Sequence, residues 1–250
     1  MCRKLIYPIF FVLGLCIALT NTADADPSLV GWWRLDEGSG TTAYDSSGNG
    51  RHGTLSGNPQ WVTGKIGGAL EFDGQGDDRV SLGSFEVTGN AITIACWFKA
   101  DNLDTPGNDP RMVSKAIGGA NDQHWFMVSS SRQSGIKVLR FRLKTDGTTG
   151  EIKADTTTGT IELNEWIHVA TTWNGVTMRI YKDGVEVGSL AKGGTLSTNP
   201  AANVAIGNQP IGAEDRPFDG IIDDVRIYNY ARTPSQILQD YNAGAAAYFK

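Results

Sequence analysis

The clearest alternation of hydrophobic and polar positions in this chain lies within residues 166–189. Apolar and polar side chains alternate over a first stretch that ends at Trp173, and the alternation resumes at Val176. A period of two is typical of a β-strand with one buried face. The pairs at 174–175 (Asn-Gly) and 183–184 (Asp-Gly) tolerate the positive φ angles of two-residue hairpin loops. The segment therefore predicts an antiparallel meander of three strands.

Shorter stretches with strand-like patterns recur along the rest of the chain between glycine, proline and aspartate residues. They are residues 29–35, 69–72, 79–82, 92–99, 112–115, 125–129, 138–143, 159–163, 204–207 and 220–229. In residues 138–143 (VLRFRL), Arg140 and Arg142 share one face of the strand, and the leucines and the phenylalanine share the other. Many short strands separated by turn signals predict an all-β protein built as a two-sheet antiparallel sandwich.

One short helix is predicted near the C-terminus. Thr233 is a typical cap residue, and Pro234 suits the first helical turn. An apolar stripe begins at Ile237 and includes Tyr241, and Gly244 is expected just past the end of the helix.

The N-terminal segment is set apart from this pattern. Residues 1–25 have the features of a secretory signal peptide: a basic start, an apolar run over 5–19, and small residues at 23–25. The run is shorter than the roughly 20 apolar residues of a membrane span, so no span is expected. Cys16 leaves a lipoprotein as an alternative. Residues 26–250 are expected to form one domain of a secreted, periplasmic or extracellular protein.

Charge and cysteine content narrow the function further. The formal net charge is −5 at pH 7, whereas a nucleic-acid-binding surface needs clustered basic residues, so nucleic acid is not expected as a partner. Cys96 is the only cysteine outside the predicted signal peptide, which excludes a disulfide within the domain. It lies in a strand pattern, where we expect it to pack as a small apolar side chain.

Several short motifs, taken in order, resemble one known family. They are residues 33–35, 45–53, 70–74 (LEFDG), 92–99, 166–172, 181–188 (YKDGVEVG) and 218–229 (FDGIIDDVRIYN). Over residues 29–244 the chain resembles the laminin-G-like jelly-roll domains of the concanavalin A-like lectin and glucanase superfamily. The resemblance implies a jelly-roll sandwich. It leaves function open, because the family includes sugar-binding modules, protein-binding adhesion domains and glucan hydrolases.

Catalysis has little support from the residues. The related glucanases carry a Glu-x-Asp-x-x-Glu pattern on one strand, and this chain has no such pattern. Asp73, Asp77 and Asp78 follow turn glycines and are expected to be solvated. His168 lies in a strand pattern and is expected to be structural. We therefore predict a non-catalytic protein, with a glucan-active hydrolase of atypical site as the less favoured alternative.

A structural calcium ion is the predicted cofactor. Residues 45–50 have the spacing Asp-x-Ser-x-Asn-Gly, which matches the opening of an EF-hand loop without its later glutamate or its helices. Two aspartates interrupt the apolar strand 220–229, and a buried carboxylate needs a partner. The resemblance implies calcium bound by an aspartate matching Asp223 and by loop carbonyls. The predicted ligands are Asp45, Asn49, Asp223 and Asp224. Alternatively, Asp223 caps loop amides or pairs with an arginine.

Ligand binding is the predicted function. Sugars bind to proteins through an aromatic ring together with amide or charged side chains. Trp125 follows a glycine-rich loop, and Arg142 lies on the polar face of its strand. The predicted ligand-binding residues are His124, Trp125 and Arg142. We expect carbohydrate or another cell-surface ligand; the alternative is an adhesion or structural protein that binds protein partners.

Overall fold

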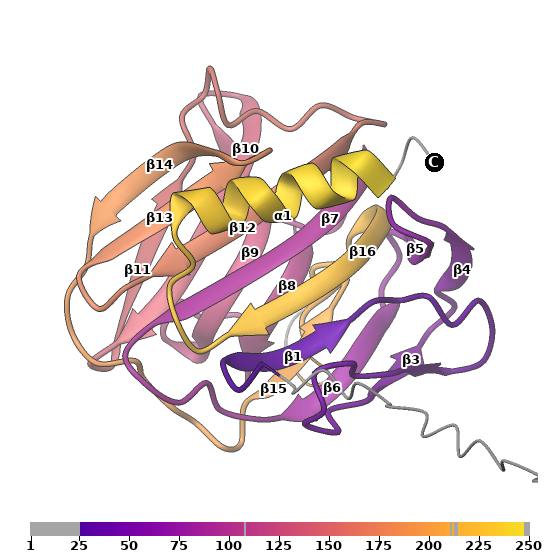
Figure 1. Cartoon of the computed structure of the whole chain (residues 1–250), viewed down its shortest axis with the longest axis horizontal. Helices are drawn as coiled ribbons and strands as arrows, with labels where there is room; N and C mark the ends of the chain where they lie inside the picture. The colour runs from indigo at the N-terminus through magenta and orange to yellow at the C-terminus, as the bar shows by residue number, and fades with distance from the viewer. Residues whose placement is uncertain (1–25, 108, 211, 213–214, 248–250) are drawn as a thin grey trace, which may run out of the picture.

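The computed structural model describes residues 26–247 except residues 108, 211 and 213–214, and the predicted signal peptide lies outside the described part. Within it, two antiparallel sheets of eight strands each pack face to face (Figure 1). An α-helix lies on the outside of one sheet. The structure thus confirms the all-β, two-sheet antiparallel sandwich with one C-terminal helix.

Each sheet mixes strands from distant parts of the sequence. Sheet A contains, in spatial order, β14 (Val185–Ala191), β13 (Thr177–Lys182), β12 (Trp166–Trp173), β7 (Ile92–Asn102), β16 (Asp219–Tyr228), β5 (Gly68–Asp73) and β4 (Gln60–Thr63), and β1 (Leu29–Trp33) pairs with β16. Sheet B contains β11 (Thr148–Lys153), β10 (Ile136–Thr145), β9 (His124–Gln133), β8 (Arg111–Ala116), β15 (Asn203–Ile206), β6 (Arg79–Ser84), β3 (Gly53–Ser56) and β2 (Thr42–Ala43). A 3₁₀ helix, η1 (Asn121–Gln123), precedes β9, and α1 (Pro234–Ala247) follows β16.

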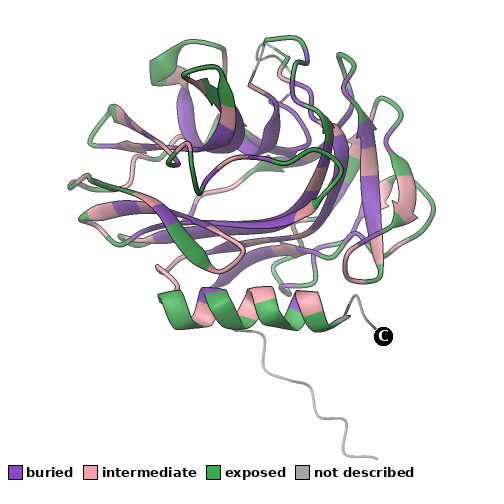
Figure 2. Ribbon diagram, turned by 90° about the horizontal axis from the view of Figure 1, so that it is seen from above, coloured by how far each residue is buried: buried purple, intermediate pink, exposed green. Residues whose placement is uncertain are grey.

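The hydrophobic core fills the space between the two sheets (Figure 2). The period of two explains it: alternate residues of β12, such as Val169 and Trp173, point inward and are fully buried. Cys96 belongs to the same core and is a free cysteine, as expected for a packed apolar side chain. Burial raises the pKa of its thiol, which makes it a poor nucleophile.

The second turn of the meander is the predicted two-residue loop. Lys182 pairs directly with Val185, so only Asp183 and Gly184 lie between the strands. Their φ angles are 51° and 82°, which are the positive values that such a turn requires.

The first turn of the meander differs from the prediction. The last paired residues are Trp173 and Met178, so the loop contains four residues rather than the pair Asn174-Gly175 alone. The Asn174 side-chain oxygen accepts hydrogen bonds from two backbone amides further along the loop, at 3.1 and 2.8 Å. An asparagine that bonds its own following backbone closes a wider turn, and the dipeptide alone did not reveal this.

Helix α1 lies across part of the outer face of sheet A, over β13, β12 and β7 (Figures 1 and 2). Ile237 is fully buried in a small cluster with Ala95, Ala170 and Tyr181. The helix begins at Pro234 as predicted.

The end of α1 lies further along the chain than predicted. Gly244 does not terminate the helix, which continues to Ala247. A Cβ atom at Gly244 would lie 2.5 Å from Nε1 of Trp97. The glycine therefore permits close approach of the helix to β7, a contact between distant segments that the local sequence does not show. No helix in the described part of the chain is long and apolar enough to cross a membrane.

Candidate binding site on sheet B

The outer face of sheet B, opposite the core, carries arginine side chains. In β10, Leu139, Phe141 and Leu143 are fully buried in the core, so Arg140 and Arg142 point to the opposite face, as the alternation predicted. They are less exposed than an ordinary solvated face would leave them: 6% of the Arg140 side chain and 15% of the Arg142 side chain are accessible. Both side chains form ion pairs with residues of neighbouring segments.

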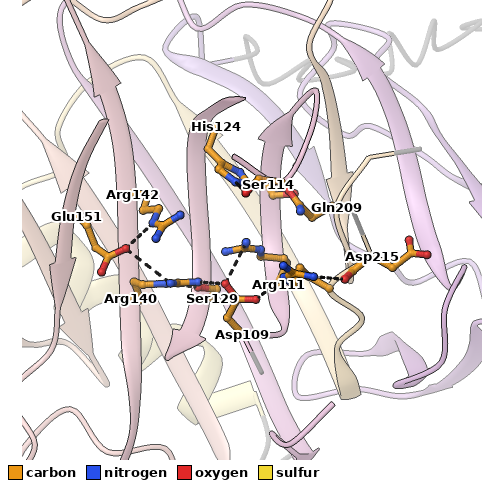
Figure 3. Close-up of polar contacts among 12 residues, drawn as sticks. Asp109, Arg111, Ser114, His124, Ser129, Arg140, Arg142, Glu151, Gln209 and Asp215 are labelled. Atoms are coloured by element: carbon orange, nitrogen blue, oxygen red, sulfur yellow. Dashed lines mark hydrogen bonds and ion pairs between the residues drawn. The ribbon is translucent and has the colours of Figure 1, made fainter. Parts of the chain in front are cut away.

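Asp109, in the loop before β8, pairs with three arginines. Its Oδ2 lies 3.1 Å from Nη2 of Arg111 and also accepts a hydrogen bond from Nη2 of Arg140. Its Oδ1 lies 2.7 Å from Nε of Arg216. Arg140 also donates from Nε to the Ser129 hydroxyl at 3.0 Å (Figure 3). One carboxylate thus organises guanidinium groups from β8, β10 and the loop after β15.

Glu151 is the second carboxylate of this network. It lies opposite Arg142 in the β10–β11 register and accepts a hydrogen bond from Nε of Arg142. Nη1 of Arg140 is 3.6 Å away, and Nζ of Lys153 is 3.8 Å away. Burial alone would raise the pKa of Glu151, but the bond from Arg142 and the nearby positive charges hold it below its usual value. We name Arg111, Arg140, Arg142 and Arg216, with Asp109 and Glu151, the arginine cluster.

Arg111 is the most deeply buried cation of the cluster, with 2% of its surface accessible. Burial lowers its pKa to about 9, Asp109 opposes the shift, and the neighbouring arginines add to it. It remains charged at neutral pH. Its Nε and Nη1 donate no hydrogen bond to any residue that the structure describes.

His124 lies beside Arg111 and Arg142 at the start of β9, and it is fully buried. Burial, together with the positive charges of Arg111 and Arg142, lowers its pKa to about 4, so the imidazole is neutral at pH 7. Nε2 is 3.4 Å from the Gly119 carbonyl. Donation to that oxygen leaves Nδ1 as an acceptor, and Nδ1 has no partner among the described residues.

A pocket of about 280 Å³ opens beside the arginine cluster. It is lined by Asn121 of η1, Arg142 of β10, and Thr149 and Glu151 of β11. The Thr149 hydroxyl donates to the Asn121 carbonyl at 2.7 Å, which ties β11 to η1. The lining therefore offers one amide, one hydroxyl, one guanidinium and one carboxylate, which together can donate to and accept from several hydroxyl groups.

The structure brings together two of the three predicted ligand-binding residues. Arg142 lines the pocket, and His124 lies next to it (Figure 3). Trp125 is 7% exposed, and the Lys144 ammonium lies over its ring, 4.8 Å from the centroid. A sugar would stack on this ring only after Lys144 moved, and stacking at Trp125 stays a prediction.

Sequence reasoning missed Asp109, Arg111, Asn121, Thr149 and Glu151. A signal for Glu151 was present. The Asp146-Gly147 pair closes a two-residue hairpin in which Thr145 pairs with Thr148, and that register places Glu151 opposite Arg142. No comparable signal existed for Asp109, because its contacts join a loop to strands that lie further along the chain.

The predicted calcium ligands occupy separate places. Asp45 organises the loop before β3: its Oδ1 accepts from the amides of Trp32 at 3.0 Å and Ser47 at 2.9 Å, and its Oδ2 accepts from the Arg51 amide at 2.9 Å. Burial alone would raise the pKa of Asp45, but these hydrogen bonds hold it below its usual value. Its carboxylate is therefore already occupied by backbone amides.

Asn49 and Asp224 also have protein partners. Asn49 donates to the carbonyl oxygens of Leu29 and Val30 at 2.8 and 3.2 Å. Asp224 accepts from Nε1 of Trp32 at 2.6 Å and pairs with Arg226 at 2.9 Å. These contacts fix the loop before β3 and the strand β16 to β1.

Asp223 is different, because one of its oxygens has no partner among the described residues. It is fully buried, its Oδ2 accepts from the Ile66 amide at 2.8 Å, and its Oδ1 makes no hydrogen bond. Burial raises its pKa to about 8, the Ile66 bond opposes the shift, and Asp224 adds to it. Asp36 approaches the same β4–β5 turn and accepts from the Gly68 amide at 2.7 Å. No three His, Cys, Asp or Glu side chains in the described part of the chain form a group that could hold a metal ion.

Comparison with known proteins assigns the sequence to a family. The model Laminin_G_3, described as the concanavalin A-like lectin/glucanases superfamily, matches residues 73–238. The chain belongs to this family.

Its similar full-length proteins are much longer than the chain. Pappalysin-1 of Mus musculus is 26% identical over 180 residues, which are 69% of this chain and 11% of that protein. Adhesion G-protein coupled receptor V1 of Danio rerio is 26% identical over 156 residues, which are 62% of this chain and 2% of that receptor. The chain thus corresponds to a small part of each relative.

Among solved structures, domain 4 of AbnA resembles nearly the whole sandwich. AbnA is a GH43 extracellular arabinanase from Geobacillus stearothermophilus, and its domain 4 was solved in complex with arabinotriose. The TM-score is 0.64 at 25% identity, covering 85% of this chain and 97% of that domain. The binding domain of botulinum neurotoxin DC, in complex with SialylT, has a TM-score of 0.64 at 16% identity, covering 87% of this chain and 52% of that one. The second likeness concerns the fold alone.

Proposed function

We propose that this protein binds carbohydrate, without transforming it, in the pocket beside the arginine cluster. The observation that carries the proposal is the pocket lining: a hydroxyl, a guanidinium and a carboxylate on strands β10 and β11, with an amide on η1 beside them. Such side chains pair with sugar hydroxyls, and strands hold them in place better than mobile loops would. The likeness to an arabinanase domain solved with arabinotriose supports the same conclusion.

The absence of chemistry is part of the proposal. Glycoside hydrolysis needs two carboxyl groups on either side of the scissile bond. Among the pocket-lining residues of the described chain, Glu151 is the one carboxylate, and Arg142 already pairs with it. Export through the segment 1–25 also belongs to the proposal and would bring the protein to extracellular or cell-surface glycans.

The test is binding of the protein to a glycan array, followed by calorimetric titration with arabinotriose and with the array's strongest oligosaccharide. The double variant Asn121→Ala, Thr149→Val should weaken binding at least tenfold, because two lining groups are removed. Thr177→Val, on sheet A, is the matched control and should bind normally. No binding to any glycan on the array, or release of reducing sugar from a bound oligosaccharide, would overturn the proposal; capture of a protein partner instead would favour an adhesion role.

A structural calcium ion is a further proposal, centred on Asp223 rather than on the loop before β3. The unpartnered, buried Oδ1 of Asp223 is the observation in its favour, since a hard cation would satisfy it and stabilise the charged form. Asp36 and carbonyl groups of the β4–β5 turn could complete the ligand set.

Excess chelator should then lower the melting temperature of the protein by several degrees. An ion whose free concentration is 100 times its dissociation constant stabilises the folded state by about 2.7 kcal/mol. Asp223→Asn should melt lower and lose the chelator effect, whereas Asp45→Asn should melt lower and keep it. Identical melting curves with and without chelator, together with no calcium by metal analysis, would remove calcium from the proposal.

A further inference from the structure

The arginine cluster contains more positively charged than negatively charged side chains. Arg111, Arg140 and Arg142 face two carboxylates, Asp109 and Glu151. Asp109 is also bound by Arg216 at 2.7 Å, and Glu151 also has Lys153 at 3.8 Å. Each carboxylate carries one negative charge but contacts several cations, so it cannot neutralise all of them. The face keeps an excess of positive charge where exposure to water is low, and such a field is strong because water screens it little.

Arg142 presents this charge to the pocket. Among the described residues, its guanidinium donates one hydrogen bond, from Nε to Glu151. Its terminal nitrogens point away from Glu151, toward the space that His124 and Arg111 also face (Figure 3). Two parallel N–H groups of a guanidinium match the paired oxygens of a carboxylate or a sulfate.

A purely structural network would distribute its groups differently. A buried cation is stabilised when all its donors are satisfied, yet Nε and Nη1 of Arg111 have no partner among the described residues at 2% exposure. Replacing the face with apolar side chains would remove this cost. Arg111 is close enough to Arg142 for the two charges to interact. A cation with unsatisfied donors at this position is an arrangement that an anionic ligand near Arg142 would help to compensate.

We propose that the carbohydrate bound here is acidic: a carboxylate or sulfate on one sugar residue binds the terminal nitrogens of Arg142, and the nearby positive charges of Arg111 and Arg140 stabilise it. Asn121 and Thr149 then bind hydroxyl groups of the same sugar or its neighbour. This inference rests on the proposed carbohydrate binding and adds the chemical class of the ligand.

The test compares three probes by calorimetry at low salt: trigalacturonate, its fully methyl-esterified form, and a chondroitin sulfate tetrasaccharide. The ester keeps the sugar and removes the charge, so trigalacturonate should bind at least tenfold tighter than its ester. Its affinity should fall as salt is raised, while that of the ester should not. Tighter binding of the sulfated probe alone would assign the anionic group to a sulfate.

Arg142→Gln should abolish the preference for the acidic probe, so that trigalacturonate and its ester bind this variant with equal affinity. Arg132→Gln is the matched control, because Arg132 lies on β9 of the same sheet but is 50% exposed and pairs with Asp104. Circular dichroism confirms that each variant is folded. If Arg142→Gln fails to fold, Arg142→Lys replaces it; this variant keeps the charge but loses the paired donors, and it should weaken acidic binding by several-fold.

Equal affinity for trigalacturonate and its ester, with Arg142→Gln weakening both alike, would overturn the acidic ligand while the proposed carbohydrate binding stands. Acidic binding that is lost in Arg132→Gln and kept in Arg142→Gln would also overturn it, since the charge would then act elsewhere. If no probe and no array glycan binds, the proposed function itself fails.

Discussion

The outer faces of the two sheets are both formed by antiparallel strands, but different groups lie on them. The outer face of sheet A is partly covered by α1, and Tyr241 of that helix stacks on Trp97 at 5.6 Å between ring centroids. The outer face of sheet B is occupied by the arginine cluster. Each face also buries one histidine, His168 on sheet A and His124 on sheet B.

The difference suits a division between stability on sheet A and the proposed binding on sheet B. Aromatic and aliphatic contacts under α1 remove apolar surface from water and stabilise the fold. Burial of arginines with incompletely satisfied donors lowers the stability of the fold. Such destabilising groups are expected where a ligand supplies the missing partners. Under the proposed function, sheet A serves as the scaffold and sheet B carries the binding site.

Removing the contact between α1 and sheet A should have the largest effect. Trp97→Ala deletes a fully buried indole that packs against Tyr241 and His168, and it should lower the free energy of unfolding by about 3–5 kcal/mol. Urea denaturation measures this free energy of unfolding. Tyr44→Ala is the control, because Tyr44 is 56% exposed. A loss below about 1 kcal/mol would show that α1 is not needed to stabilise the sheet.

Acid should destabilise both faces through their histidines. Burial lowers the pKa of His168 to about 3 and that of His124 to about 4, whereas the unfolded value is near 6.5. The unfolded state therefore binds protons first. Stability is fully present above pH 6.5 and falls as the pH drops, down to about 4 for His124 and about 3 for His168. The slope is on the order of 1.4 kcal/mol per pH unit for each histidine.

Urea denaturation at pH 7.5, 5.5 and 4.5 measures this dependence. His168→Gln should remove the contribution of the helix-covered face and His124→Gln that of the arginine face, each making the pH dependence shallower. A double variant with the wild-type pH dependence would contradict both assignments.

A smaller effect is expected at the turn beneath α1. Gly184 has a φ of 82°, and a Cβ atom there would lie 2.7 Å from Cδ1 of Leu238 in the helix. Gly184→Val should cost about 1 kcal/mol or more, because a β-branched residue resists positive φ. Gly193→Ala is the control, since a Cβ at Gly193 meets nothing within 4 Å. Thermal melting that is identical for the two variants would contradict the role of the turn.

The smallest change in the free energy of unfolding is expected in the arginine cluster. Whether this free energy rises or falls is more informative there than the size of the change. Arg111→Met removes a buried cation and leaves Asp109 paired with Arg140 and Arg216. The free energy of unfolding should stay the same or rise by up to about 1 kcal/mol, because a buried ion pair contributes little net stability. Arg132→Met should be neutral. A loss above about 2 kcal/mol would make Arg111 a structural residue and weaken the comparison.

Local features of the fold were predictable from the sequence. Alternation placed Arg140 and Arg142 opposite the core residues of β10, and Asp183-Gly184 fixed the second turn of the meander. The start of α1 followed from Thr233 and Pro234, since Gln236 and Thr233 bond each other's backbone amides at 2.9 and 3.3 Å. These features depend on residues that are close in sequence, and sequence patterns report such contacts well.

The site was harder to predict because it is assembled from distant segments. Nothing near Asp109 in the sequence indicates that it would gather arginines from β8, β10 and the loop after β15. The covering of Trp125 by Lys144 likewise joins two strands. Arg142 was identified from its place on a strand face, but its partners depend on how strands and loops meet in space.

The order of strands in the sheets has a consequence for how the chain folds. β16 lies between β7 and β5 and also pairs with β1, while β15 lies between β8 and β6. Each sheet is therefore joined across its middle by a strand from residues 203–228. A nascent chain without these residues has the earlier strands of each sheet but no partner to link them. Such long-range pairing is slow to form, and neither sheet is complete until residues 203–228 are available to pair.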